Sequence, residues 1–254
     1  MKSYSLQPDI IYGPVDSRRL GKSLGINLMP SEYKLCSMNC CYCQYGWTTA
    51  MPVSADVHQF RLPSHEYILR KIQAGIKGQT GVNYLTIAGN GEPTLHPDFA
   101  QIIDGLIDLK NKYLPDVKIA LLTNGTTCSN SIIIDAINKI DLPIIKLDAG
   151  TEQCFREINH PGRDVNLIDI INGIKNIKKY FIQTMFVSGS VNNSSEHEVN
   201  AWIGRLQQLR PQMVQVYSIA RSPASCSVEA IPHDRLLEIA SLLETKTGLR
   251  AEVA

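Results

Sequence analysis

Short apolar runs and longer helical patterns alternate along most of the chain, and this alternation restricts the fold more than any other feature. The strand-like runs lie at 24–29, 83–88, 117–122, 144–148, 181–187 and 213–219. The helical patterns lie between and after them, at 64–76, 98–113, 130–140, 165–179, 195–209 and 232–246. Six successive strand–helix units favour parallel strands joined by right-handed crossovers. The predicted class is α/β, either a complete or partial barrel or an open doubly wound sheet.

Composition sets the general class of protein. The chain has 254 residues, 44% of them apolar and 19% charged, with a formal net charge of +1. These values predict a globular chain and give no electrostatic argument for binding nucleic acid. We find neither an apolar run long enough to cross a membrane nor the apolar centre of a signal peptide. We expect one domain over 1–254, with its core at about 12–220 and a C-terminal helix at about 232–246.

Seven cysteines, four of them crowded together, argue against a secreted disulfide framework and predict a reduced, cytoplasmic protein. Cys36, Cys40 and Cys43 have C-x3-C-x2-C spacing. A structural zinc site needs four ligands, which usually come in two separated pairs. Three thiolates on one loop can instead hold three corners of a four-iron cluster, and leave the fourth iron open to a substrate or cosubstrate. Cys41 breaks this spacing and is interpreted as a spare thiol.

Polar and glycine residues follow several of the predicted strands. The second strand ends in GNGEPT (89–94), the third in TNGT (123–126), the fourth in KLDAG (146–150) and the fifth in SGS (188–190). Strand alternation places Lys146 and Asp148 on one face. Each segment alone has an ordinary explanation as a turn or an ion pair. Because parallel α/β folds carry their chemistry at the carboxyl ends of strands, the four segments together predict a site beside the cysteine loop.

Several segments of the sequence resemble the motifs of one known enzyme superfamily. The loop CSMNCCYC, with Tyr42 before its last cysteine, resembles the cluster-binding signature of the radical S-adenosylmethionine (radical SAM) superfamily, and GNGEPT resembles its glycine-rich segment. The flanking segments IYGPVDSRRLGKSLGINL, TNGT, KLDAG and QTMFVSG are similar to small radical SAM proteins related to wyosine-base synthases. This resemblance covers the chain from about Tyr12 to the final helix. It implies a partial (β/α)6 TIM-like barrel of parallel strands.

The resemblance also implies a mechanism and two cofactors, a [4Fe–4S] cluster and S-adenosylmethionine. In the superfamily, the amino and carboxylate groups of S-adenosylmethionine chelate the open iron. One electron from the reduced cluster then yields methionine and a 5′-deoxyadenosyl radical that abstracts hydrogen. Here the implied cluster ligands are Cys36, Cys40 and Cys43. The implied cosubstrate contacts are Tyr42 near the adenine, Gly89, Asn90, Gly91 and Glu92 at the methionine end, Asn124 at the ribose or carboxylate, and Ser188 and Gly189 near the adenine or ribose.

Candidates for substrate contact rest on position alone. They are Lys146, Asp148, Tyr217, Arg221 and Cys226. Cys226 is interpreted first as a buried apolar residue, like Cys128 and Cys154, and second as a hydrogen-atom donor or substrate contact. A small basic patch before the first strand comprises Arg18, Arg19 and Lys22. It could meet a phosphate or carboxylate of the substrate, but a solvated face is the commoner role of such a patch.

Differences from the wyosine synthases restrict the function. Those enzymes are expected to carry a second cluster on upstream cysteines, and residues 1–35 contain none. We therefore expect radical chemistry on a small metabolite, nucleoside or peptide, with an electron donor such as flavodoxin or ferredoxin. A glycyl-radical activase acting on a partner protein is the alternative within the superfamily. An electron-transfer iron–sulfur protein and a zinc-stabilised binding protein are the alternatives outside it.

Overall fold

The computed structural model describes residues 5–17, 19–52 and 60–254. Its main sheet has the order β1-β2-β3-β4-β5-β6-β7-β9. Neighbours from β2 to β7 are parallel, as is the pair β7–β9, whereas β1 runs antiparallel to β2. The strands are β1 (Ile11–Ser17), β2 (Gly21–Ile26), β3 (Tyr84–Ile87), β4 (Lys118–Thr123), β5 (Leu142–Lys146), β6 (Phe181–Gly189), β7 (Val214–Ser218) and β9 (Ala251–Val253), with β8 (Val228–Ala230) antiparallel to β6.

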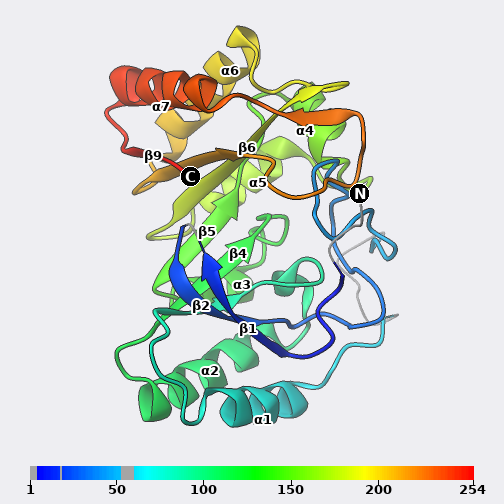
Figure 1. The fold of residues 1–254 in the computed structure, drawn as a ribbon, viewed down its shortest axis with the longest axis vertical. Coiled ribbons are helices and arrows are strands. Elements are labelled where there is room, and N and C mark those ends of the chain that lie inside the picture. The colour runs from blue at the N-terminus through cyan, green and yellow to red at the C-terminus, as the bar shows by residue number, and fades with distance from the viewer. Residues whose placement is uncertain (1–4, 18, 53–59) are drawn as a thin grey trace.

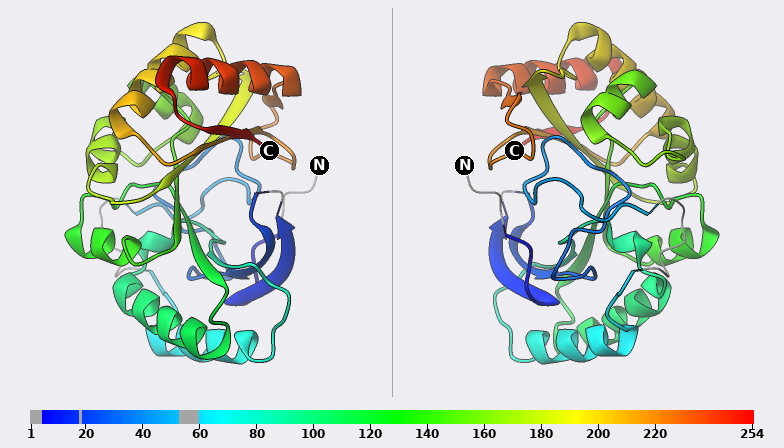
Figure 2. Two further views of the ribbon diagram at one scale, coloured as in Figure 1. Left: turned by 90° about the vertical axis from the view of Figure 1, so that its left-hand side faces the viewer. Right: turned by 90° about the vertical axis from the view of Figure 1, so that its right-hand side faces the viewer.

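The sheet curves into an open barrel with helices on its outer surface (Figures 1 and 2). Because β1 and β9 are the two ends of the strand order, the barrel is partial, as predicted. The α-helices are α1 (His65–Ile76), α2 (Phe99–Tyr113), α3 (Ser131–Ile137), α4 (Glu152–Asn159), α5 (Leu167–Ile174), α6 (Glu196–Leu209) and α7 (His233–Thr247), and the short 3-10 helix η1 (Pro93–Leu95) follows β3. No helix in the described ranges is long and apolar enough to span a membrane.

Alternation along the strands separates two apolar regions. In β4, Ile119 and Leu121 belong to the large core, while Ala120 belongs to a small cluster with Leu20 and Ile144. The large core also takes the buried faces of the outer helices, so the small cluster lies on the inner side of the sheet. Leu20 comes from the turn between β1 and β2 and therefore fills part of the barrel interior.

The predicted strands and helix starts are largely confirmed. All six predicted parallel strands are present, and Ser64 and Ser195 cap α1 and α6 by accepting N–H bonds from Tyr67 and Glu198, each at 3.3 Å. The first predicted strand, 24–29, starts earlier, at Gly21, and stops at Ile26. Beyond it, the Asn27 side chain bonds the backbone of Met29 and turns the chain.

Five elements of the described ranges were missing from the prediction: β1, the 3-10 helix η1, α4, β8 and β9. The strands β8 and β9 have three residues each, which is too short for a periodic pattern to be visible. Helix α4 has eight residues between the glycine-rich end of β5 and the next helix. Its N-cap is Thr151, whose side chain accepts from Cys154 N at 3.2 Å. A short capped helix of this kind resembles a loop in the sequence.

Candidate functional site

The cysteine loop follows β2 and covers the mouth of the barrel at the carboxyl ends of the strands (Figure 2). Its first part is bonded to the glycine segment after β3. Leu35 N donates to Asn90 O at 3.0 Å, and Glu92 N donates to Leu35 O at 3.0 Å. A Cβ on Gly91 would lie 1.7 Å from Leu35 O, so a larger residue cannot occupy this position. The glycine segment therefore supports the loop that carries Cys36.

The second part of the loop is bonded to α4 and to the segment after β7. Cys41 N donates to Ile158 O at 2.9 Å, and Ser225 N donates to Cys41 O at 2.8 Å. The Cys41 side chain is 3% exposed and belongs to the apolar core, and burial raises the pKa of its thiol to about 12. Cys40 and Cys43 are half-buried, and Cys43 N closes a turn onto Cys40 O at 3.0 Å. Cys41 is thus the most deeply buried of the four thiols on this loop.

Two buried amides point at the sulfur atoms. Asn124 Nδ2 lies 3.6 Å from Cys36 Sγ, and Asn159 Nδ2 lies 3.3 Å from Cys40 Sγ. Burial raises the pKa of both thiols, so a bound metal would have to hold them as thiolates. Amide donors suit thiolate sulfur atoms, and hydrogen bonds of this kind are known to tune iron–sulfur clusters. The donor set therefore fits an iron–sulfur cluster.

A cluster and a single ion place different demands on the three thiols. Within the described part of the chain, no three His, Cys, Asp or Glu side chains converge on one metal position. A single zinc ion would need such convergence. A cluster presents a different iron to each thiolate, so Cys36, Cys40 and Cys43 need not meet at one point.

Glu92 is 2% exposed and joins the ends of β3 and β4. Its Oε1 accepts from Thr94 N, Thr94 Oγ1 and Thr123 Oγ1 at 3.1, 2.6 and 2.7 Å, and its Oε2 accepts from Asn124 N at 2.7 Å. Burial raises the pKa of this carboxyl, while the hydrogen bonds act in the opposite direction. A carboxylate offers about four acceptor positions, so Oε2 keeps spare capacity.

Asn90 is fully buried and holds the N-terminal segment in place. Its Nδ2 donates to Gln7 O at 2.9 Å and to Pro30 O at 2.8 Å, and its Oδ1 accepts from Gln7 N at 2.7 Å. The Asn90 amide is therefore engaged with the protein backbone. Gly89 has a φ of +146°, and a Cβ there would lie 2.4 Å from Asn27 Oδ1.

The other predicted cosubstrate residues lie apart from one another. The Asn124 side chain donates to Ser37 Oγ at 2.9 Å and accepts from Thr126 N at 3.0 Å, next to the cysteine loop. Ser188 and Gly189 end β6, where they pair with β8. A Cβ on Gly189 would lie 2.3 Å from Ser227 O, so this glycine permits the close approach of the following chain.

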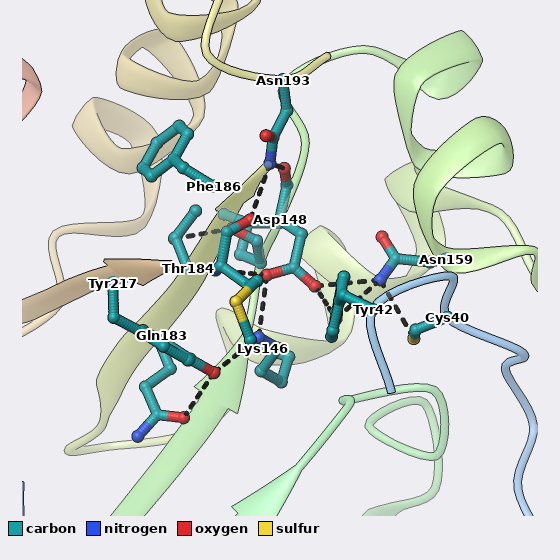
Figure 3. Close-up of polar contacts among 12 residues, drawn as sticks. Cys40, Tyr42, Lys146, Asp148, Asn159, Gln183, Thr184, Phe186, Asn193 and Tyr217 are labelled. Atoms are coloured by element: carbon teal, nitrogen blue, oxygen red, sulfur yellow. Dashed lines mark hydrogen bonds and ion pairs between the residues drawn. The ribbon is translucent and has the colours of Figure 1, made fainter. Parts of the chain in front are cut away.

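Lys146 forms an ion pair with Asp148, but β5 ends at Lys146, so Asp148 lies beyond the strand and not on it as predicted. Lys146 Nζ lies 2.9 Å from Asp148 Oδ1 and donates to Tyr217 OH at 2.9 Å (Figure 3). Asp148 Oδ2 accepts from Tyr42 OH and from Asn159 Nδ2, the latter at 2.9 Å. Because the Asn159 amide also contacts Cys40 Sγ, hydrogen bonds connect the cysteine loop to Lys146.

A cavity of about 430 Å³ occupies the barrel interior below the loop. Tyr42 and Cys43 line it at the cysteine loop, and Lys146, Tyr217 and Arg221 line it from the strands and the segment after β7. Its volume lies in the range of small-molecule sites. The glycine segment, Ser188, Gly189 and Cys226 do not line it. Cys226 is exposed, which corrects its first interpretation as a buried apolar residue, whereas Cys128 and Cys154 are buried.

The sequence did not predict the contact of Asn159 with Cys40, and it did not predict that Arg19 lines the cavity. Asn159 ends α4, a helix absent from the prediction, and its contact to Cys40 spans 119 residues. A motif search offers no signal for such a contact. Arg19 was expected on a solvated face, but it lines the cavity, while Lys22 is exposed. Arg18, the third member of that patch, lies outside the described residues.

The sequence model of the Radical SAM superfamily matches residues 33–202, well over half of the chain. The chain belongs to the radical SAM superfamily. The match includes the cysteine loop, the glycine segment, Asn124 and Asn159.

Two curated relatives extend the comparison. A UPF0026 protein of Methanocaldococcus jannaschii is 32% identical over 221 residues, which are 85% of this chain and 65% of the relative. A Brachyspira hyodysenteriae protein named GTPase Obg is 27% identical over 248 residues, which are 96% of this chain and 35% of the relative. This radical SAM chain thus spans about a third to two thirds of the length of these relatives.

Solved structures share the fold of this radical SAM protein. Streptococcus suis SuiB bound to S-adenosylmethionine has a TM-score of 0.60 at 16% identity, over 91% of this chain and 50% of SuiB. The structure of TYW1 with a lysine-pyruvate adduct bound has a TM-score of 0.59 at 19% identity, over 89% of this chain and 74% of TYW1. The native enzyme anSMEcpe with bound AdoMet has a TM-score of 0.63 at 14% identity, over 90% of this chain and 63% of anSMEcpe.

Proposed function

We propose that this chain holds one [4Fe–4S] cluster on Cys36, Cys40 and Cys43, binds S-adenosylmethionine at the remaining iron, and starts radical chemistry on a small metabolite, nucleoside or peptide. The observation that carries the proposal is the position of the cysteine loop. It lies over the mouth of the barrel, the thiols of Cys36 and Cys40 face amide donors, and Tyr42 and Cys43 form part of the wall of the interior cavity. A cosubstrate at the loop would therefore meet a substrate in the cavity.

The cluster would supply the electron that cleaves the sulfonium of S-adenosylmethionine and releases a 5′-deoxyadenosyl radical. The residues of the chain hold and orient the reactants. Asn124 and Asn159 donate toward two cluster thiolates and fix their direction. Glu92, with spare acceptor capacity at Oε2, would accept from the ammonium group of the cosubstrate.

The remaining predicted residues would contact the methionine, adenine and ribose parts of the cosubstrate. Gly89, Asn90 and Gly91 would present backbone atoms to the methionine end, because the Asn90 side chain is already bonded to the N-terminal segment. Tyr42 would pack near the adenine, and its hydroxyl is held by Asp148. Ser188 and Gly189 would approach the adenine or ribose.

Lys146, Tyr217 and Arg221 would contact the substrate, because all three line the cavity. Asp148 positions Lys146 through their ion pair. Cys226 is exposed on the segment that also carries Ser225, whose N–H bonds the cysteine loop, so it remains a proposed contact from outside the cavity. The chain would act as a single domain over 1–254, and a flavodoxin or ferredoxin would deliver the electron.

The test is anaerobic reconstitution with iron and sulfide, followed by iron and sulfide analysis and electron paramagnetic resonance of the dithionite-reduced protein. We expect about four irons and four sulfides per chain, because a three-thiolate site of this type holds a four-iron cluster. Addition of S-adenosylmethionine should change the spectrum, and 5′-deoxyadenosine and methionine should appear in mass spectrometry.

Two outcomes would contradict the proposal. Tight binding of zinc without a four-iron cluster would favour a zinc-stabilised binding protein. A reduced cluster whose spectrum is indifferent to S-adenosylmethionine would favour an electron-transfer protein.

A further inference from the structure

We propose that the cavity binds its substrate by an anionic group, a carboxylate or a phosphate, placed against Arg19 and Lys146 beside the Tyr217 ring. This inference deepens the proposed function by naming the substrate class, and it rests on that function. It comes from the charges that line the cavity and from the hydrogen-bonding capacity that they leave unused.

The cavity wall carries an excess of positive charge. Among the described lining residues, the cations are Arg19, Lys146 and Arg221, and the single carboxylate is Asp16, which is exposed. Asp148, the counter-ion of Lys146, does not line the cavity. A small cavity with low-dielectric walls and charges of one sign concentrates the field and attracts a ligand of opposite charge.

Arg19 lies on the turn between β1 and β2 and reaches across the open side of the barrel to β7. Its Cζ lies 4.3 Å from the centroid of the Tyr217 ring. No side-chain hydrogen bond or ion pair of Arg19 occurs within the described ranges, and its Nη1 is buried without an acceptor. Leaving a charged donor unsatisfied is costly, and a guanidinium fork matches the oxygen atoms of carboxylate and phosphate.

Lys146 presents its charge to the same ring, with Nζ 4.9 Å from the Tyr217 centroid (Figure 3). An ammonium group has three donors, and Asp148 and Tyr217 accept two of them. The Lys146 side chain is 19% exposed and that of Asp148 0%, so the cation faces the cavity and the carboxylate lies behind it. Burial acts to lower the pKa of Lys146, but Asp148 and Tyr217 raise it above its ordinary value, so the group stays charged.

The size of the cavity and its aromatic residues restrict the ligand further. About 430 Å³ accommodates a small molecule or a single side chain of a peptide. Tyr12, Tyr42 and Tyr45 line the cavity together with Tyr217, so a planar group would be well accommodated beside the anion. Lys146 Nζ also lies 4.8 Å from the centroid of the Tyr42 ring, so the cysteine loop borders the proposed anion position.

The test measures binding of defined probes to the cluster-loaded protein under argon by isothermal titration calorimetry. Benzoate and inorganic phosphate are the two anionic probes, and benzamide is the neutral counterpart of benzoate. We expect at least one anion to bind at least tenfold more tightly than benzamide. Preference for benzoate would identify a carboxylate substrate, and preference for phosphate a phosphorylated one.

Substitutions of Arg19 test whether the anionic probes bind at the proposed position. Arg19→Gln should weaken binding of the preferred anion at least tenfold, and Arg19→Lys should keep part of it, because the charge remains while the planar fork is lost. The matched control Arg250→Gln, at an exposed position outside the cavity lining, should bind as the wild type does. Equal affinity for benzoate and benzamide without phosphate binding, or an Arg19→Gln variant that binds as tightly as wild type, would overturn the inference.

The same preparations distinguish this inference from the proposed function. Cleavage of S-adenosylmethionine without anion binding would reject the anion site and leave the radical function standing. Anion binding by a protein that never cleaves S-adenosylmethionine would support the anion site and reject the radical function.

Discussion

Asn159 Nδ2 lies 3.3 Å from Cys40 Sγ and 2.9 Å from Asp148 Oδ2, so one amide contacts both a proposed cluster ligand and the counter-ion of Lys146. The Asn159 side chain is buried, and its Oδ1 has no partner among the described residues. We interpret Asn159 as a positioning residue that orients the Cys40 sulfur and connects the cysteine loop to the cavity.

Asn159→Ala should lower the reduction potential of the reconstituted cluster. An N–H···S bond stabilises the more negative reduced state, and its loss, at about 1 kcal/mol, corresponds to roughly 40 mV for one electron. Spectroelectrochemical titration under argon measures the shift. Asn176→Ala, at an exposed position on the protein surface, is the control and should leave the potential unchanged. An unchanged potential in the Asn159 variant would show that the amide does not influence the cluster through Cys40.

Cys40→Ala and Cys41→Ala should differ sharply although they are adjacent. Cys41 belongs to the apolar core, whereas the Cys40 sulfur faces Asn159. We expect Cys40→Ala to lose the four-iron cluster and the cleavage of S-adenosylmethionine. Cys41→Ala should retain both and lose about 1 kcal/mol of unfolding free energy.

Iron and sulfide analysis and 5′-deoxyadenosine quantification measure the difference between the two cysteine variants. The opposite pattern, with the cluster lost only from the Cys41 variant, would mean that the spacing was assigned to the wrong thiol.

Strand periodicity could predict the parts of the site that sit on strands. Lys146 and Asp148 are two residues apart, so strand alternation predicted that their side chains share one face. The two side chains do form an ion pair, although β5 ends at Lys146 and Asp148 lies beyond it. The cysteine loop was predictable from its spacing. Both signals are local in the sequence.

Contacts between distant segments were not predictable in the same way. Glu92 bonds Thr123 and Asn124 across two neighbouring strands, and Asn90 bonds Gln7 across 83 residues. These bonds depend on strand register and on the path of a loop over the barrel mouth, which a hydrophobic pattern does not encode. For this reason the sequence predicted the glycine segment only as a cosubstrate contact and gave no indication that it supports the cysteine loop.

Gly91→Ala should destabilise the protein and impair cluster loading. The new Cβ would lie 1.7 Å from Leu35 O, and the φ of +145° is unfavourable for any residue with a side chain. We expect a loss of more than about 2 kcal/mol of unfolding free energy, measured by urea denaturation. Iron content should fall as well, because Leu35 precedes Cys36.

Gly204→Ala is the matched control for this substitution. Gly204 lies in α6, and a Cβ there would have no atom within 4 Å, so alanine should stabilise the helix by about 0.5–1 kcal/mol. Equal effects of the two substitutions would show that the contact between Gly91 and Leu35 can relax at little cost.

His96 should make stability fall in mild acid. Its side chain is buried, its Nδ1 accepts from Asp98 N at 3.1 Å, and its Nε2 lies 2.9 Å from Pro63 O. The neutral ring with hydrogen on Nε2 satisfies both contacts, and protonation of Nδ1 would break the first. Burial accordingly lowers the pKa of His96 below its ordinary value of 6.5.

The unfolding free energy falls in acid because the unfolded chain binds a proton at His96 more readily than the native chain. Below about pH 6.5 the unfolded chain binds a proton at His96 that the native chain does not, so the unfolding free energy decreases by up to about 1.4 kcal/mol per pH unit until the native pKa is reached. Above pH 6.5 this contribution is fully present. Urea denaturation between pH 5.5 and 8 should show a shallower pH dependence in His96→Gln than in wild type. His197→Gln, at an exposed histidine, should follow the wild-type curve. Parallel curves for all three proteins would rule out the buried neutral imidazole as the cause.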